Sequence, residues 1–260
     1  MKYHIIRDGW IKVPAADFQI GESQSPIERL MIGLNQVLLQ ISGKNVLVDT
    51  GLGTKWQPEQ ISLLDFEQPR QLINQIREHG FSEDDIDIVV LTHLHYDHCG
   101  GNTRFDTAGK PIAVFPNAKY YVQRTELEFA LNPGPDHETD YIIEDFNPLI
   151  ENGQLELIDG DLEIMSGLKV FHAPGHCPGH QVVLAEREGD CLFFPGDLFS
   201  TREHANLVMT TNFDMDRDEI LLHRSKWLKK AIKNRWQCVY CHGIRDIVEI
   251  LERDQNVDQS

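Results

Sequence analysis

The sequence predicts an α+β protein in which helices cover the outer faces of two packed β-sheets. Apolar stretches of strand length, separated by turns, recur through both halves of the chain. Segments with one apolar helical face also occur in both halves. The stretch "IDIVVLT" (residues 86–92) is apolar almost throughout, as is typical of a strand buried on both faces. Strands and helices mixed in this way bury their apolar faces as packed layers.

In the N-terminal half, "QVLLQISGKNVLVDTGLG" (residues 36–53) predicts two strands around a Ser-Gly turn, followed by a glycine-rich loop. The stretch "QPRQLINQIREHGF" (residues 68–81) predicts a helix with one apolar face. Pro69 fits its first turn, and Gly80 closes it.

The remaining elements follow from the same patterns. Asp216 and Glu219 form a capping-box pattern at the start of a long amphipathic helix. Short apolar runs bounded by turn residues predict strands. The predicted strands cover residues 110–116, 118–123, 153–160, 162–167, 168–176 and 236–243, a hairpin covers 181–197, and the helices cover 124–131, 216–234 and 244–254.

Two segments lack clean periodicity. The stretch from residue 132 to 148 contains three prolines, and we interpret residues 130–148 as a lid or an entrance loop. Residues 9–32 show no strong pattern. One interpretation left open is that these residues form an arm that covers the functional site of the other subunit in a homodimer.

Length and charge limit the class of protein. A chain of 260 residues, 41% hydrophobic and 25% charged, fits one domain over residues 1–260. The net charge of −17 argues against a nucleic-acid partner, because such binders carry a clustered basic face. The N-terminus lacks the apolar core of a signal peptide, and no apolar run is long enough to span a membrane. We therefore expect a cytoplasmic protein with no membrane partner.

The five cysteines are scattered and odd in number, as is typical of reduced thiols rather than of a disulfide framework. The stretch "CVYCH" (residues 238–242) matches the pattern of covalent haem attachment. That attachment needs an exported, oxidising compartment, so we expect no haem. Cys99 and Cys177 stand beside candidate metal ligands, and we expect both to be small buried side chains.

The stretch "THLHYDHCGG" (residues 92–101) holds three histidines and an aspartate within six positions. It follows the predicted buried strand at the carboxyl end, where ligands bind in α/β architectures. Imidazoles and a carboxylate in this density point to metal binding. One metal could not take all four side chains from so tight a loop. Two adjacent metals could, with His93 and His95 on one and Asp97 and His98 on the other.

Three further candidate ligands end later predicted strands: His176 in "APGHCPGH", Asp197 in "FFPGD" and His242 in "CVYCHG". A carboxylate that bridges both metals completes the two sets. These sets are His93, His95, His176 and Asp197 for one metal, and Asp97, His98, His242 and Asp197 for the other. We expect two divalent metal ions, Zn²⁺ foremost, with iron, manganese or cobalt left open by the ligands.

The motifs "HLHYDH … PGH … GD … HG", with "LVDTG" upstream, resemble the metallo-β-lactamase superfamily over residues 34–243. The resemblance implies an αββα sandwich, in which two mixed β-sheets are flanked by helices and the site lies between the sheet edges. Diiron redox members usually carry glutamate at the position of His95. The histidine here favours a hydrolase over the alternative of a diiron redox protein.

The site itself suggests how hydrolysis would proceed. Two metals roughly 3.5–4 Å apart would hold a bridging water and lower its pKa toward about 7, which provides a hydroxide that attacks an ester or lactone. Asp97 is the predicted catalytic residue, because its second oxygen can carry a proton to the leaving group. Asp49 is expected to orient a ligand histidine through a hydrogen bond. His172 and His180 are expected to support the packing or the ligands.

The segment "GDLFSTREHANLVMTTNFDMD" (residues 196–216) resembles the lactonase-like branch, which includes acyl-homoserine lactonases and organophosphate hydrolases. The resemblance implies a small-molecule lactone or ester as substrate, and a role in quorum quenching. Phosphotriester and thioester hydrolysis on the same site are the alternatives. Two departures leave the acyl-chain pocket open: Ser200 stands where some acyl-homoserine lactonases have tyrosine, and "HGI" stands where close relatives often have "HDP".

Overall fold

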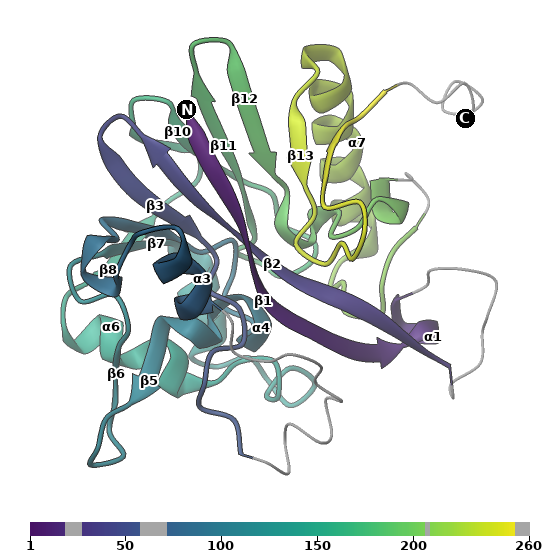
Figure 1. The fold of residues 1–260 in the computed structure, drawn as a ribbon. Coiled ribbons are helices and arrows are strands. Elements are labelled where there is room, and N and C mark those ends of the chain that lie inside the picture. Colours follow the sequence, from purple (N-terminus) through teal and green to yellow (C-terminus); the bar gives the residue numbers. More distant parts are fainter. Residues whose placement is uncertain (19–27, 58–71, 206–208, 253–260) are drawn as a thin grey trace.

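The computed structural model describes residues 1–18, 28–57, 72–205 and 209–252. It contains two six-stranded sheets and a small third one (Figure 1). The first sheet has the spatial order β1 (Lys2–Pro14), β2 (Arg29–Ile41), β3 (Lys44–Val48), β4 (Ile88–Val90), β7 (Lys119–Gln123) and β8 (Leu155–Ile158). The second has the order β14 (Val248–Ile250), β13 (Gln237–Val239), β12 (Asp190–Phe194), β11 (Gln181–Arg187), β10 (Leu168–His172) and β9 (Leu162–Met165). The small sheet pairs β5 (Thr103–Phe105) with β6 (Pro111–Ala113).

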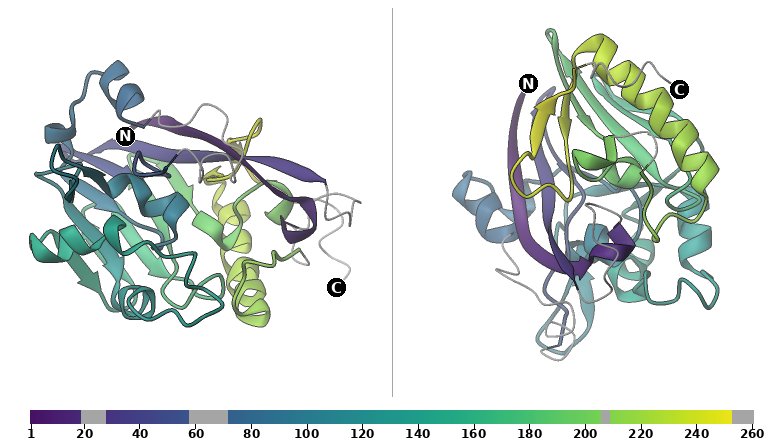
Figure 2. Two further views of the ribbon diagram at one scale, coloured as in Figure 1. Left: turned by 90° about the horizontal axis from the view of Figure 1, so that it is seen from below. Right: turned by 90° about the vertical axis from the view of Figure 1, so that its right-hand side faces the viewer.

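Short helices fill most connections, and one long helix covers the second sheet (Figure 2). The α-helices are α1 (Ala15–Phe18), α3 (Leu72–Glu78), α4 (Tyr96–Cys99), α5 (Arg124–Ala130), α6 (Asn147–Glu151) and α7 (Arg217–Asn234). The 3₁₀-helices are η1 (Glu83–Asp85), η2 (Gly100–Asn102), η3 (Ile143–Asp145), η4 (Gly196–Leu198) and η5 (Glu203–Ala205).

Alternation along β2 shows how the layers form. Val37 and Leu39 belong to the apolar cluster between the two sheets, together with Val183 and Phe194 of the second sheet. Leu38, between them in sequence, belongs to a cluster on the outer face. Successive side chains of a strand point to opposite faces, so a continuous apolar run serves a sheet that is covered on both sides. The predicted αββα sandwich of two mixed sheets is confirmed.

Helix α7 covers the outer face of the second sheet (Figures 1 and 2). The predicted cap is present, because the Asp216 side chain accepts a hydrogen bond from the backbone N–H of Glu219. Trp227 and Ile220 are buried on the helix face that meets the sheet, where the Trp227 ring stacks 5.5 Å from that of Phe193. The described part of the chain contains no helix with the length and apolarity needed to cross a membrane.

Two predicted elements differ from the structure. The predicted final helix over residues 244–254 is wrong: β14 forms there and pairs antiparallel with β13. Ile247 also accepts a hydrogen bond from the backbone N–H of Tyr240, so the open edge of β13 overrides the local helical pattern. The helix predicted over 68–81 is present as α3, although Pro69 lies outside the described residues.

Within the N-terminal segment 9–32, residues 9–18 and 29–32 belong to β1, α1 and β2, and residues 19–27 lie outside the described part of the chain. Strands β1 and β2 pair over their whole length as a hairpin that runs past the sheet and ends in α1 (Figure 1). Ile11, Phe18 and Ile32 form a separate apolar cluster there with Leu52. The strand predicted before the Ser42–Gly43 turn is the second half of β2, whereas β1 and the first half of β2 were not predicted. A role of the hairpin in a homodimer stays a prediction.

Candidate metal centre

The "THLHYDHCGG" loop leaves the first sheet at the carboxyl end of β4, beside the end of β3. Asp49 joins the two strand ends: its carboxylate accepts hydrogen bonds from the backbone N–H and the hydroxyl of Thr92, at 2.7 and 2.8 Å. Asp49 adopts a left-handed backbone with φ of 57°, which is strained for a residue other than glycine and is common at functional sites.

The two glycines that end this loop allow a close backbone approach. A β-carbon at Gly100 would clash with the carbonyl of Leu52, and one at Gly101 would clash with the carbonyl of Thr50. Only glycine therefore fits at both positions. The contact holds the histidine-rich segment against the glycine-rich loop that follows β3.

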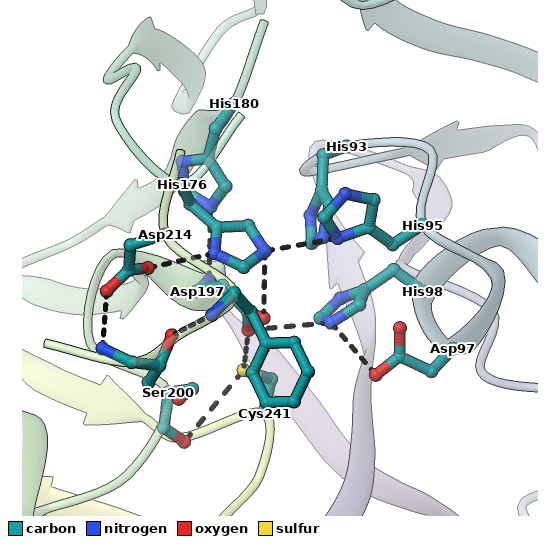
Figure 3. Close-up of polar contacts among 12 residues, drawn as sticks. His93, His95, Asp97, His98, His176, His180, Asp197, Ser200, Asp214 and Cys241 are labelled. Atoms are coloured by element: carbon teal, nitrogen blue, oxygen red, sulfur yellow. Dashed lines mark hydrogen bonds and ion pairs between the residues drawn. The ribbon is translucent and has the colours of Figure 1, made fainter. Parts of the chain in front are cut away.

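Side chains from four strand ends converge between the edges of the two sheets (Figure 3). In the first group, one ring nitrogen from each of His93, His95 and His176 lies within 4.8 Å of the others. The burial of all three imidazoles makes them an unusual polar cluster inside a folded protein.

The second group combines His98, His242 and Asp197 with Cys241, again with all ligand atoms within 4.8 Å of one another. Asp197 faces both groups. Its Oδ2 lies 3.3 Å from Nε2 of His176, and its Oδ1 lies 3.4 Å from Nε2 of His98 and 3.3 Å from Nε2 of His242. This is the position predicted for a bridging carboxylate.

Asp97 stands beside the second group. Its Oδ2 lies 3.7 Å from Nε2 of His98 and 3.6 Å from Nε2 of His242, and its side chain also lines the adjoining cleft. The structure thus brings all seven predicted ligands into one cluster, but Asp97 stands at the edge of the second group rather than within it. Cys241, which was not predicted as a ligand, belongs to that group.

Imidazole nitrogens that lack a hydrogen-bond partner test whether the cluster fits metal ions. The Nε2 atoms of His93, His95 and His98 are buried, and no protein group in the described residues hydrogen-bonds to them. Leaving such an atom without a partner costs about 1–3 kcal/mol. These three nitrogens and the Asp197 carboxylate beside them are donors of the kind that zinc and similar dications prefer. The residues therefore fit a pair of divalent metals.

Hydrogen bonds on the far ring nitrogens aim these histidines, as is usual for metal ligands. These hydrogen bonds join Nδ1 of His98 to Asp49 at 2.9 Å, Nδ1 of His176 to Asp214 at 3.0 Å, and Nδ1 of His242 to the carbonyl of Gly33 at 2.8 Å. Asp49 thus contacts a candidate ligand histidine, as predicted. Each pair leaves Nε2 directed at the cluster.

Two buried side chains support the backbone of the ligand loops. His180 accepts the backbone N–H of Asp197 at its Nε2, at 3.0 Å, which confirms the supporting role predicted for it. Glu126 accepts the backbone N–H groups of Leu94 and Gly179, at 2.9 and 3.1 Å. Burial raises the pKa of the Glu126 carboxyl. His172, by contrast, contacts only the backbone around the site, through the carbonyl of Pro178.

The charges within the cluster follow from burial and from neighbours. Burial lowers the pKa of His93 and His95 well below its usual value, and the adjacent histidines add to this effect. Burial also disfavours the charged form of His98, but the Asp197 and Asp97 carboxylates outweigh it and hold the pKa well above its usual value. His93 and His95 are therefore neutral imidazoles, the form that binds metals, whereas the Asp197 and Asp214 carboxylates outweigh burial and raise the pKa of His176.

Sequence reasoning missed three residues of the centre: Asp214, Glu126 and Cys241. Asp214 and Glu126 lie in a loop and a helix without a motif, and they reach the site only through the tertiary fold. Cys241 had a signal, since it directly precedes the ligand His242 at a strand end. Cys99 and Cys177 are buried, as predicted.

Ser200 belongs to a buried network next to the centre. Its hydroxyl donates to Nδ1 of His204, 3.1 Å away, and Nε2 of His204 lies 3.1 Å from the carbonyl of Phe18, to which it donates. The network therefore ties α1, at the tip of the N-terminal hairpin, to the loop that follows Asp197. A neutral imidazole fits both contacts, because its Nδ1 then accepts the hydrogen bond from the serine while Nε2 donates.

This network predicts a pH effect on stability. Burial lowers the pKa of His204 to about 4, against roughly 6.5 in the unfolded chain. The unfolded chain therefore binds a proton first as the pH falls, so the contribution of His204 is present above about pH 6.5 and is lost toward pH 4. Between pH 7.5 and pH 5 the loss amounts to about 2 kcal/mol. Urea unfolding of the metal-free protein should show this loss relative to His204→Gln, and equal pH slopes for both proteins would contradict it.

A cleft adjoins the candidate metal ligands. The candidate ligands that line it are His95, Asp97, His176, Asp197 and His242. The apolar side chains that line it, here called the apolar wall, are Ile11, Val13, Phe18, Ile32 and Phe213. Ser200 is not among the described residues that line this cleft. The segment predicted as a lid contributes Asp140 to one side, and its closure stays a prediction.

A buried histidine and aspartate cluster at the strand ends of an αββα sandwich defines a metal-dependent protein of the hydrolytic type. Residues 33–233 match the family model of the metallo-beta-lactamase superfamily, and the chain belongs to that superfamily. This confirms the resemblance seen in the motifs.

Relatives of this chain include lactonases, and a solved lactonase shares its fold. An N-acyl homoserine lactonase of a Bacillus species is 28% identical over 235 residues, which is 85% of each chain. An N-acyl homoserine lactonase of Bacillus thuringiensis is 30% identical over 172 residues, and the match spans 65% of this chain and 60% of that relative. The structure of AidC, a dizinc quorum-quenching lactonase in complex with a product, superposes with a TM-score of 0.78 at 22% identity, over 98% of this chain and 91% of that one. This last likeness supports the fold.

Proposed function

We propose that this metal-dependent hydrolase opens an acyl-homoserine lactone or a closely related small lactone or ester. One observation carries the proposal: the cleft is lined by candidate ligands, among them Asp197 and His95 with its unpartnered Nε2, and also by apolar side chains. A polar reacting centre beside an apolar wall suits a substrate with a polar ring and an alkyl chain. Relatives named as N-acyl homoserine lactonases support the same substrate class.

The chain's own residues divide the work. His93, His95 and His176 would hold one metal, and Asp97, His98 and His242 the other, with Asp197 between them. Two dications bound there would supply a water of lowered pKa as the nucleophile and would polarise the carbonyl oxygen. Asp97 faces the cleft from beside the second group, from where it can deliver a proton to the alkoxide that the ring opening releases.

The apolar wall would hold the acyl chain. Phe18 and Phe213 offer the largest surfaces in it. Ser200 is buried and bound to His204, so we assign it to the support of Phe18 rather than to contact with the substrate. A role in quorum quenching and the use of zinc follow from the same proposal, because an acyl-homoserine lactone is a signalling molecule and zinc suits the nitrogen-rich ligands.

A substrate panel on the metal-loaded protein tests the proposal. It contains acyl-homoserine lactones of short and long chain, a lactone without the acyl amide, a nitrophenyl ester, a phosphotriester and a thioester. We expect the highest kcat/KM on the acyl-homoserine lactones, with a rise for longer chains that bury more of the apolar wall. Chelation should abolish this activity, and added Zn²⁺ should restore it.

Other outcomes of the panel would reject the proposal. A higher kcat/KM on the phosphotriester or the thioester would assign the site to one of those alternatives. Activity on lactones that survives complete metal removal would remove the metals from the reaction. Purified protein that holds two iron ions and shows redox-active absorbance, with no hydrolysis of any substrate, would favour the diiron alternative.

A further inference from the structure

The "CVYCH" stretch does not act as one unit in the fold. Cys238, on β13, is buried in the outer cluster that contacts α7, with its thiol toward the carbonyl of Trp236. Cys241 lies beyond the end of β13, in the cluster between the two sheets. The two thiols thus belong to opposite faces of the second sheet, and only Cys241 is directed at the metal centre (Figure 3).

Cys241 shares its contacts with two histidine ligands. Its Sγ lies 3.0 Å from Oδ1 of Asp197, the same oxygen that lies 3.4 Å from Nε2 of His98 and 3.3 Å from Nε2 of His242. In a tetrahedral site with metal–nitrogen and metal–oxygen bonds of about 2.1 Å and a metal–sulfur bond of about 2.3 Å, neighbouring ligand atoms are roughly 3.3–3.8 Å apart. Oδ1 of Asp197 has these spacings to both histidine nitrogens, and Sγ of Cys241 lies within 4.8 Å of every ligand atom of the group.

A second observation points to a ligand at this place. Nε2 of His98 is buried, has no hydrogen-bond partner and is directed into the same group. The thiol of Cys241 donates to the Asp197 carboxylate and so does not satisfy that nitrogen. A cation among the four side chains would bind both the His98 nitrogen and the Cys241 sulfur.

We propose that Cys241 is a sulfur ligand of the metal held by His98, His242 and Asp197. The inference rests on the proposed two-metal site and adds a donor to it. When the metal–sulfur bond forms, the S–H bond breaks and the proton passes to solvent, so the subsite gains one negative charge. Sulfur favours zinc, cobalt and cadmium over manganese. The Cys241 subsite therefore selects softer metals.

X-ray absorption at the zinc edge of the protein loaded with two zinc ions tests the proposal without any activity measurement. We expect a sulfur shell at about 2.3 Å beside nitrogen and oxygen at about 2.0–2.1 Å. Its amplitude should correspond to one sulfur atom per two zinc ions, because only one of the two metals binds Cys241. Cys241→Ser should lose the sulfur shell. Cys238→Ser is the matched control, since it removes a buried thiol three positions away, and it should keep the shell.

Metal competition gives an independent measurement. With zinc and manganese offered together, Cys241→Ser should shift the zinc preference of the protein by at least about tenfold toward manganese, while Cys238→Ser should leave it unchanged. Cobalt-loaded wild-type protein should also show a sulfur-to-metal charge-transfer band that Cys241→Ser lacks.

Each result decides the question. Two bound zinc ions with only nitrogen and oxygen neighbours in the wild type would overturn the role of Cys241 and leave the proposed hydrolase intact. A sulfur shell that survives in Cys241→Ser would also overturn it. A wild-type protein that binds no metal would instead overturn the proposed function. If Cys241→Ser does not fold, the wild-type spectrum and Cys241→Ala decide in its place.

Discussion

Asp197→Asn is expected to lower kcat/KM by at least about 10³-fold and to release metal from the protein. Asp197 offers one oxygen to each group, Oδ2 toward His176 and Oδ1 toward His98 and His242. Asparagine keeps the shape but removes the negative charge between two dications in a buried site. The lost charge stabilisation amounts to several kcal/mol, and a change of about 1.4 kcal/mol in the activation free energy corresponds to a factor of ten in rate.

Burial and charge explain why this aspartate is special. Burial alone would raise the pKa of Asp197, but His242, His98 and His176 surround it and hold the pKa well below its usual value. The carboxylate therefore stays ionised before any metal arrives. An amide at this position would remove a carboxylate that lies within 3.4 Å of a ring nitrogen of each histidine.

The measurement is metal content after dialysis, together with kcat/KM on the best substrate of the panel. Asp140→Asn is the matched control, because it removes the same charge from the side of the same cleft but outside both ligand groups. It should keep two metals and most of the activity. An Asp197→Asn protein with two metals and the wild-type rate would show that Asp197 bridges nothing.

Asp97→Asn is expected to lower kcat by about 10²–10⁴-fold on lactones, the range that a positioned proton donor contributes. The carboxylate lies 3.6 Å from Nε2 of His242 and also lines the cleft, so it contacts both the centre and the substrate space. A lactone releases an alkoxide, which needs a proton. A nitrophenyl ester releases a stable anion, which does not.

The comparison of these two substrates separates the possible roles of Asp97. If it delivers the proton, Asp97→Asn should lose far more activity on the lactone than on the nitrophenyl ester, and its metal content should stay at two. Equal losses on both substrates, or the loss of one metal, would make Asp97 a ligand without a role in proton transfer. Asp140→Asn again serves as the control for a charge change in the cleft.

Local patterns in the sequence predicted most of the fold. The strand runs on both sides of the Ser42–Gly43 turn and the capping pattern at Asp216 are properties of neighbouring residues, so they are visible without a structure. The segment at 244–254 could not be predicted in this way. Its strand exists because β13 has an open edge, and that edge is formed by residues far away in the chain.

The candidate ligands were also predictable, because each stands in a short motif at a strand end. Their close approach in space depends on the fold, yet the order of the motifs along the chain was sufficient to predict it. Asp214 and Glu126 carry no such motif. Their partners, His176 and the backbone of Leu94, are 38 and 32 positions away, so only the folded chain reveals these contacts.

The sequence by itself determined the chemical identity of the centre: a histidine-rich loop, three later ligands and a histidine at position 95. It could do so because metal ligands are specific residue types placed at strand ends, where the chain must turn. The tertiary structure alone decided which other groups surround them. It directs Cys241 rather than Cys238 at Asp197, since two thiols three positions apart look alike in sequence until the sheet sets one on each face.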